Sequence, residues 1–267
     1  MKTVISCSRR SDVPAFYSDW LVAALETGSV WVANPFNGRR RRVNLTPNSV
    51  HTLVLWSKNF APLLGRADAF RRYHLFFHFT INTPCELEGA LPPLDARLEQ
   101  MAEISRRFGS RRLTWRFDPI VFWRTKDGSP RHNLDAFEQI ASFAAKCGVK
   151  RCVISFVTLY RKVLLRQRRL GVWFEELSSE RKREIAAELA DKAARFGIKV
   201  FACCQPVLAE VVAPSACING KLLSELAGEP APTKKDPGQR KECNCTVSVD
   251  IGRYRSCRYR CAYCYAI

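Results

Sequence analysis

Three cysteines stand close together near the end of the chain, in the stretch Cys257-Arg-Tyr-Arg-Cys261-Ala-Tyr-Cys264. Cysteine thiolates are the usual protein ligands of iron–sulfur clusters, and three of them can bind three irons of a cubane 4Fe-4S cluster. The fourth iron would then have no protein ligand nearby, which leaves it open to a substrate or cofactor. Structural zinc takes four ligands, usually in separated pairs, so the C-x3-C-x2-C spacing favours iron over zinc.

With Tyr263 before the third cysteine, this stretch resembles the C-x3-C-x-aromatic-C signature of the radical S-adenosylmethionine (SAM) enzymes. The resemblance implies that the three cysteines bind a 4Fe-4S cluster, that the open iron binds the amino and carboxylate groups of SAM, and that Tyr263 lies near the adenine. That superfamily carries the motif near the N-terminus, after the first barrel strand. The whole chain resembles an uncharacterised prokaryotic family with the cluster at the other end, which looks like a circular permutant of the radical-SAM barrel. Residues Ser248–Gly252 would be the strand that leads into the cluster loop.

A further group of cysteines lies in the same C-terminal third. A second cluster, or a separate metal site, would use Cys204, Cys217, Cys243 and Cys245. We expect Cys203 to be structural, because neighbouring side chains on a strand point to opposite faces. The remaining cysteines are expected to be small buried hydrophobic residues: Cys7, Cys85, Cys147 and Cys152.

A polar loop follows the first apolar segment and precedes a helix expected from Pro14. Loops at strand ends are where α/β proteins place ligand-binding groups. Candidates to bind the carboxylate or ribose of SAM are therefore Arg9, Arg10, Ser11 and Asp12. The alternative for Ser11 or Asp12 is an ordinary helix N-cap. We also expect the helix near Pro14 to lie beside the C-terminal loop.

Three more residues at predicted strands are candidates to act on a substrate. Lys58 follows a strand, in a Trp-Ser-Lys-Asn element similar to one in spore photoproduct lyase-like proteins. His78 shares a strand face with Phe76 and would point into a barrel lumen, unless it is a hydrogen-bonded core residue. Asp118 shares a face with Arg116, in an Arg-Phe-Asp-Pro-Ile element that also resembles the photoproduct-lyase branch. The two are either a structural ion pair or part of the site, because a buried charge needs a partner.

Short apolar strands alternate with helices along the chain, which indicates a parallel α/β fold. Together with the resemblance, this predicts a partial, circularly permuted (β/α) TIM-like barrel with a C-terminal Cys-rich cluster loop. Residues 1–205 would form the barrel body, and residues 206–267 would be a Cys-rich segment that completes the same domain. The expected strands are Lys2–Cys7, Ser29–Asn34, Val50–Trp56, Tyr73–Ile81, Arg112–Ile120, Cys152–Thr158 and Ile198–Cys204. The expected helices are Pro14–Thr27, Pro62–Arg71, Pro92–Phe108, Asn133–Cys147, Ser179–Phe196 and Lys221–Ala227.

Composition sets the outer limits. At 267 residues and 47% hydrophobic residues, the chain can bury one large core, and a (β/α) barrel typically takes about 250 residues. No apolar run approaches the roughly 18 residues of a membrane span, and the first ten residues are too weakly apolar for a signal peptide. Twelve cysteines in such a chain suggest a reducing cytoplasm and metal or redox chemistry.

The formal net charge of +18 favours a polyanionic partner such as DNA or RNA. The positive residues are clustered in the run 39–42, in the segment 161–169 and from Lys234 onward. The alternative is a solvated, arginine-rich surface, and no helix-turn-helix, zinc-finger or RNP-type sequence adds support for nucleic-acid binding.

Three hypotheses for function follow. The first is a radical-SAM enzyme that cleaves SAM to a 5'-deoxyadenosyl radical, draws electrons from a donor such as flavodoxin or ferredoxin, and acts on nucleic acid. The second is an iron–sulfur electron-transfer or sensor protein without SAM chemistry. The third is a zinc-stabilised nucleic-acid-binding protein.

Overall fold

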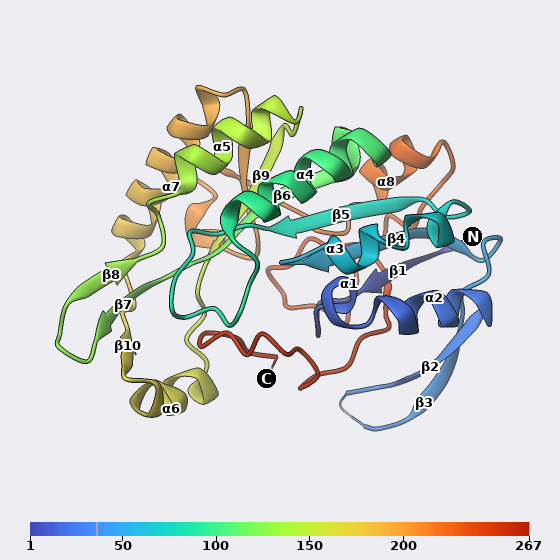
Figure 1. Ribbon diagram of the computed structural model, residues 1–267, viewed down its shortest axis with the longest axis horizontal. Coiled ribbons are helices and arrows are strands. Elements are labelled where there is room, and N and C mark those ends of the chain that lie inside the picture. The colour runs from blue at the N-terminus through green and yellow to red at the C-terminus, as the bar shows by residue number, and fades with distance from the viewer. Residues whose placement is uncertain (36, 267) are drawn as a thin grey trace.

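One sheet of eight strands organises the computed structural model, which describes residues 1–35 and 37–266. The strand order is β12-β11-β9-β6-β5-β4-β1-β13, and every neighbouring pair is parallel. Figure 1 shows these strands running side by side through the molecule. Their bounds are β1 (Thr3–Cys7), β4 (Val50–Ser57), β5 (Leu75–Thr80), β6 (Leu113–Ile120), β9 (Arg151–Phe156), β11 (Lys199–Ala202), β12 (Ala213–Pro214) and β13 (Val249–Asp250).

Helices cover one face of the sheet, which we call the outer face. The main ones are α4 (Leu94–Phe108), α5 (Phe137–Lys146) and α7 (Ser179–Ala194). Apolar side chains from alternate strand positions pack beneath them in the largest core cluster, among them Leu55, Phe77 and Trp115. The alternation of strands and helices in the sequence predicted this layer of helices on a parallel sheet.

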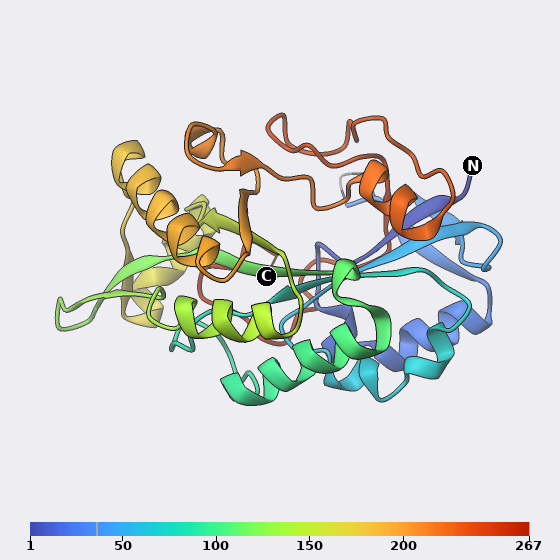
Figure 2. The same cartoon turned by 90° about the horizontal axis from the view of Figure 1, so that it is seen from above.

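The other, inner face is covered by the C-terminal third of the chain. Val4, Val54 and Phe76 pack there against Cys217 and Leu223, the latter on α8 (Gly220–Ala227). Figure 2 shows α8 and its flanking coil on the side of the sheet opposite α4 and α5. The predicted alternation of the fifth strand is confirmed, because Phe76 and Phe77 belong to the inner and outer clusters respectively.

The last strand lies beside the first. Ile5 pairs with Val249 and Ser6 with Asp250, in parallel, so the predicted strand near 248–252 is confirmed in a shorter form. The C-terminal segment thus adds β12 to one edge of the sheet and β13 to the other. In the described part of the chain no pairing joins these two edges, so the fold is an α/β fold with an open parallel sheet, and a closed TIM barrel is not confirmed. Ile267, the last residue of the predicted segment, lies outside the described residues.

Two helix predictions are wrong in detail. The predicted helix 14–27 is two helices, α1 (Val13–Phe16) and α2 (Ser18–Glu26), because Tyr17 leaves the helical region at φ −136° and ψ 27°. The predicted helix 62–71 is also divided, into α3 (Ala61–Leu64) and the 3-10 turn η1 (Ala67–Phe70).

Several elements were not predicted as such. The basic segment 161–169 forms the helix α6 (Arg161–Leu170), which ends at Gly171 with φ 64°. The predicted strand 29–34 pairs outside the main sheet. Smaller elements are the hairpin of β2 (Ser29–Ala33) and β3 (Arg40–Asn44), the antiparallel strands β7 (Phe122–Thr125), β8 (Pro130–His132) and β10 (Val172–Phe174), and the 3-10 turns η2 (Ser110–Arg112) and η3 (Pro206–Leu208). No helix in residues 1–35 and 37–266 is long and apolar enough to cross a bilayer.

Candidate functional site

The three C-terminal cysteines lie together in one cluster beside the carboxyl ends of the strands. Cys257, Cys261 and Cys264 all belong to it, and Cys261 is buried. Burial raises the pKa of the Cys261 thiol to about 12, with the Lys58 ammonium opposing that effect. A bound metal cation reverses the preference, because it stabilises the thiolate.

The segment that carries these cysteines is held by contacts from distant parts of the chain. Asp250, at the end of β13, accepts hydrogen bonds from the Ser8 hydroxyl at 2.8 Å and the Arg9 amide at 2.8 Å. Tyr17 donates to the carbonyl of Ser256 at 2.6 Å. The ring of Phe16, on α1, lies 4.5 Å from the ring of Tyr259. The helical segment after Pro14 therefore lies beside the C-terminal loop, as predicted.

A buried polar network borders Cys261. Lys58, at the end of β4, lies 2.6 Å from Glu88 Oε1 and donates to the Tyr263 hydroxyl at 3.0 Å. Tyr263 itself donates to Glu88 Oε1, and Asn82 Nδ2 does so at 2.9 Å. Burial by itself would raise the pKa of Glu88. The Lys58 ammonium and the hydrogen bonds outweigh burial, so the net pKa of Glu88 lies below its ordinary value and its carboxyl group is ionised. Its second oxygen, Oε2, is buried and has no hydrogen-bond partner among the described residues.

The polar loop after β1 has mostly structural contacts. Asp12 accepts hydrogen bonds from the Ser57 hydroxyl at 2.6 Å, the Lys58 amide at 2.8 Å and the Ala15 amide at 3.0 Å, so it caps α1. Burial raises the pKa of Asp12 to about 6, against those hydrogen bonds. Ser11 accepts a hydrogen bond from the Ser256 hydroxyl at 2.8 Å. Asp12 is therefore a helix N-cap, which was the alternative to a SAM-binding role.

Arg10 and Arg9 point in different directions. Arg10 Nε lies 3.8 Å from Asp250 Oδ1, and its guanidinium lies over the ring of Tyr254. Arg9 instead reaches the inner face, where it lies over Trp56 and hydrogen-bonds to Cys245. The four loop candidates are therefore divided between the two groups of cysteines.

The second group contains five cysteines in contact on the inner face. The Sγ atoms of Cys203 and Cys217 are 3.3 Å apart. Side-chain hydrogen bonds continue from Cys203 to Cys204, from Cys204 to Cys243 and from Cys243 to Cys245. Hydrogen bonds from Cys203 and Cys243 lower the pKa of Cys204 well below its ordinary value. The four cysteines of the predicted second site therefore lie in one cluster, and Cys203 lies there with them.

Cys203 was expected to point away from this group, and that expectation is wrong. The alternation rule holds within a strand, but β11 ends at Ala202. Cys204 then has φ 51°, so the backbone turns and both side chains meet the same group.

His78 and Asp118 also lie by the second group. The ring of His78 is buried, its Nε2 is 2.7 Å from the Cys217 carbonyl oxygen, and burial lowers its pKa to about 4. Arg116 donates to Asp118 and, through Nη1, to Cys217 Sγ at 2.9 Å. The predicted ion pair is thus present, whereas His78 has the contacts of a hydrogen-bonded core residue.

A hydrogen-bonded path leads from the second group of cysteines to the polar network beside Cys261. Asp118 takes part through its backbone amide, which donates to Asn82 Oδ1 at 2.8 Å. Asn82 in turn donates to Glu88, beside Lys58 and Tyr263. Asn82 and Glu88 were not singled out from the sequence, because they lie in the irregular loop 81–93, where no periodicity marks a buried polar residue. Their only sequence indication is that the loop follows the end of a parallel strand.

A single metal ion needs several donor atoms that converge on one point. Among residues 1–35 and 37–266, no three His, Cys, Asp or Glu side chains are arranged to hold one metal ion. The thiolates of a cubane cluster bind different irons, so they do not have to converge on a single point. The thiols of the two groups of cysteines are the side chains that could bind such a cluster.

Residues 4–266 match a protein family described as a domain of unknown function, DUF1848. The chain belongs to this family. The match spans both groups of cysteines and every strand of the main sheet except the first residue of β1. A search of curated proteins found no match.

Proposed function

We propose that this DUF1848 protein is a radical-SAM-like enzyme whose cluster is bound by Cys257, Cys261 and Cys264. The observation that carries the proposal is the clustering of these three cysteines beside a buried network of Lys58, Glu88 and Tyr263. When bound, a reduced 4Fe-4S cluster with SAM supplies a 5'-deoxyadenosyl radical that abstracts hydrogen from a substrate. The protein's part is to hold and orient the reactants and exclude water.

Several residues fit the cofactor in chemical terms. Glu88 Oε2 is a buried, negatively charged acceptor without a partner in the described chain, and the amino group of SAM keeps N–H donors when its nitrogen binds iron. We assign Glu88 to bind that group. Tyr263, whose hydroxyl is fixed by Lys58 and Glu88, offers an aromatic ring for the adenine. Lys58 keeps Glu88 ionised and so prepares the acceptor.

The arrangement of the sheet supports a permuted partial barrel. Its strands follow one another in chain order from β1 to β12, and β13 pairs beside β1. If β13 were moved to the start of the chain, the parallel strands would follow one another in chain order. The segment after β13, which contains Cys257, Cys261 and Cys264 and which we call the cysteine loop, would then follow the first strand. In barrels of this kind the loops at the carboxyl ends of the strands build the active site.

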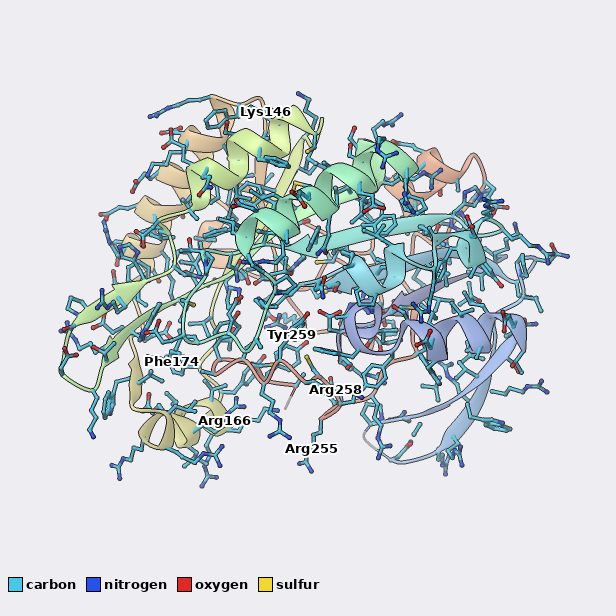
Figure 3. All side chains as sticks on the ribbon, viewed as in Figure 1. Lys146, Arg166, Phe174, Arg255, Arg258 and Tyr259 are labelled. Carbon is cyan, nitrogen blue, oxygen red and sulfur yellow. The ribbon has the colours of Figure 1, made fainter. Side chains whose placement is uncertain are left out.

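Nucleic acid is the substrate class that the charge distribution favours. Exposed arginines lie on β3, on α6 and on the cysteine loop, and these elements follow the lower edge of Figure 1. Figure 3 shows Arg166, Arg255 and Arg258 along that edge. Arg166 also donates to the carbonyl of Cys264, so this surface adjoins the proposed cluster. A one-electron donor such as flavodoxin or ferredoxin and a reducing cytoplasm complete the proposal.

The test is a metal and redox characterisation under anaerobic conditions. Wild-type protein should contain iron and sulfide, be brown and bleach with dithionite, and Cys261→Ala should lose the cluster that binds SAM. Iron without any SAM cleavage would favour an electron-transfer or sensor protein. Zinc without iron would favour a zinc-stabilised nucleic-acid-binding protein and would overturn the proposal.

A further inference from the structure

The five cysteines on the inner face come from separate segments of the chain. Cys203 and Cys204 follow β11, Cys217 follows β12, and Cys243 and Cys245 precede β13. Cys217, Cys243 and Cys245 are 8%, 7% and 2% exposed. A free cysteine that only fills an apolar core behaves as a small hydrophobic residue, whereas here five thiols from three segments gather in one cluster.

Two guanidinium groups face these thiols. Arg116 Nη1 donates to Cys217 Sγ at 2.9 Å, and Arg9 hydrogen-bonds to Cys245. Arg116 has a carboxylate partner in Asp118. Arg9, by contrast, forms no side-chain ion pair with a carboxylate in the described residues, and its Nη2 is buried without a hydrogen-bond partner.

A buried N–H donor without an acceptor is costly. Neutral thiols are only weak acceptors for the Nη2 atom of Arg9, whereas thiolates and the sulfides of a cluster supply negative charge and hydrogen-bond acceptors. Hydrogen bonds to cluster sulfurs are also a known determinant of cluster potential. The unpartnered Nη2 atom is therefore a second, independent indication of a ligand at this place.

We propose that the inner-face group is a second iron–sulfur cluster site, in which four of the five thiolates bind iron and Arg9 and Arg116 donate hydrogen bonds to cluster sulfur. The fifth thiol then lies next to the cluster. This site is separate from the Cys257, Cys261 and Cys264 loop and does not depend on SAM chemistry there. The path through Asp118, Asn82 and Glu88 connects its surroundings to those of the first cluster.

The experiment compares the full chain in three cysteine variants after anaerobic reconstitution with iron and sulfide. The first variant replaces Cys257, Cys261 and Cys264 with Ala, the second is Cys204→Ser with Cys243→Ser, and the control is Cys147→Ala. We expect about eight irons per chain in the wild type and the control, and about four in each of the other two. A first variant without iron, or with zinc at the second site, would overturn the proposal.

The outcomes separate the two sites. If the first variant keeps all the wild-type iron and the second loses it, the second site stands and the proposed radical-SAM site fails. Because replacing Cys204 and Cys243 together can also unfold the chain, a further measurement uses Arg9→Gln in the background of the first variant. There we expect unchanged iron content and a lower cluster midpoint potential, because a positive charge has been removed. An unchanged potential would contradict the assignment of Arg9.

Discussion

Glu88 has one oxygen that accepts from Lys58, Tyr263 and Asn82, and a second that is buried without a partner in the described chain. Such an atom is costly to bury unless a ligand satisfies it. Its place next to Cys261 makes it the residue through which SAM binding can be tested apart from cluster binding.

Glu88→Gln should weaken SAM binding about tenfold to a hundredfold and leave iron content unchanged. The reason is that a hydrogen bond to a charged group contributes about 1.5–3 kcal/mol, and the amide removes the negative charge. Equilibrium dialysis of SAM against the reconstituted protein measures the effect. The control is Glu86→Gln in the same loop, where the amide oxygen can still accept from Trp123. Wild-type affinity in Glu88→Gln would contradict the role assigned to Glu88.

At the scale of elements, the loop 81–93 and the cysteine loop are fitted closely together. A Cβ at Gly89 would lie 2.0 Å from the carbonyl oxygen of Tyr259. Ala262 donates to the carbonyl of Leu87 at 2.7 Å. Glycine is therefore required at this crossing by the approach of another backbone and not by its own φ angle.

Gly89→Ala should lower the free energy of unfolding by about 1–3 kcal/mol, the usual cost of overpacking, and should speed the loss of iron. Urea unfolding and the release of iron to a chelator measure the two effects. Gly65→Ala is the matched control, because a Cβ there meets only backbone oxygens at 3.7 Å. Equal stability of the two variants would mean that the loops are not docked in this way.

The elements also show where sequence patterns suffice. Alternation assigned Phe76 and Phe77 to opposite faces correctly, because β5 is a regular strand. The same rule failed at Cys203 and Cys204, where the strand has ended and φ is positive. The short spacing of Cys257, Cys261 and Cys264 was enough to predict that these residues lie together. Asn82 and Glu88, by contrast, join the site through contacts with residues far away in the sequence. Such contacts have no local pattern, so only the folded chain reveals them.

At the scale of the whole molecule, the charge of +18 predicts salt-dependent binding of nucleic acid. The expected binding surface is the one formed by β3, α6 and the cysteine loop. Lys162→Glu with Arg168→Glu should weaken binding of a single-stranded oligonucleotide. The magnitude of the slope of log affinity against log salt should fall by about 0.7 for each phosphate that the variant no longer neutralises. Fluorescence anisotropy over a salt series measures both effects.

The control for that experiment has the same change in charge at the opposite edge. Lys146→Glu with Lys150→Glu serves, since Figure 3 shows Lys146 far from Arg166 and Arg255. If both pairs of substitutions weaken binding equally, the attraction comes from net charge alone and this edge is not a binding surface.

Formation of 5'-deoxyadenosine tests the central proposal most directly. Reconstituted wild-type protein should be reduced with dithionite under anaerobic conditions, incubated with SAM and assayed by chromatography with mass detection, beside Cys261→Ala and Cys147→Ala. We predict 5'-deoxyadenosine and methionine from the wild type and Cys147→Ala, and none from Cys261→Ala. If cluster-loaded wild-type protein forms no more 5'-deoxyadenosine than Cys261→Ala does, the radical-SAM proposal is contradicted.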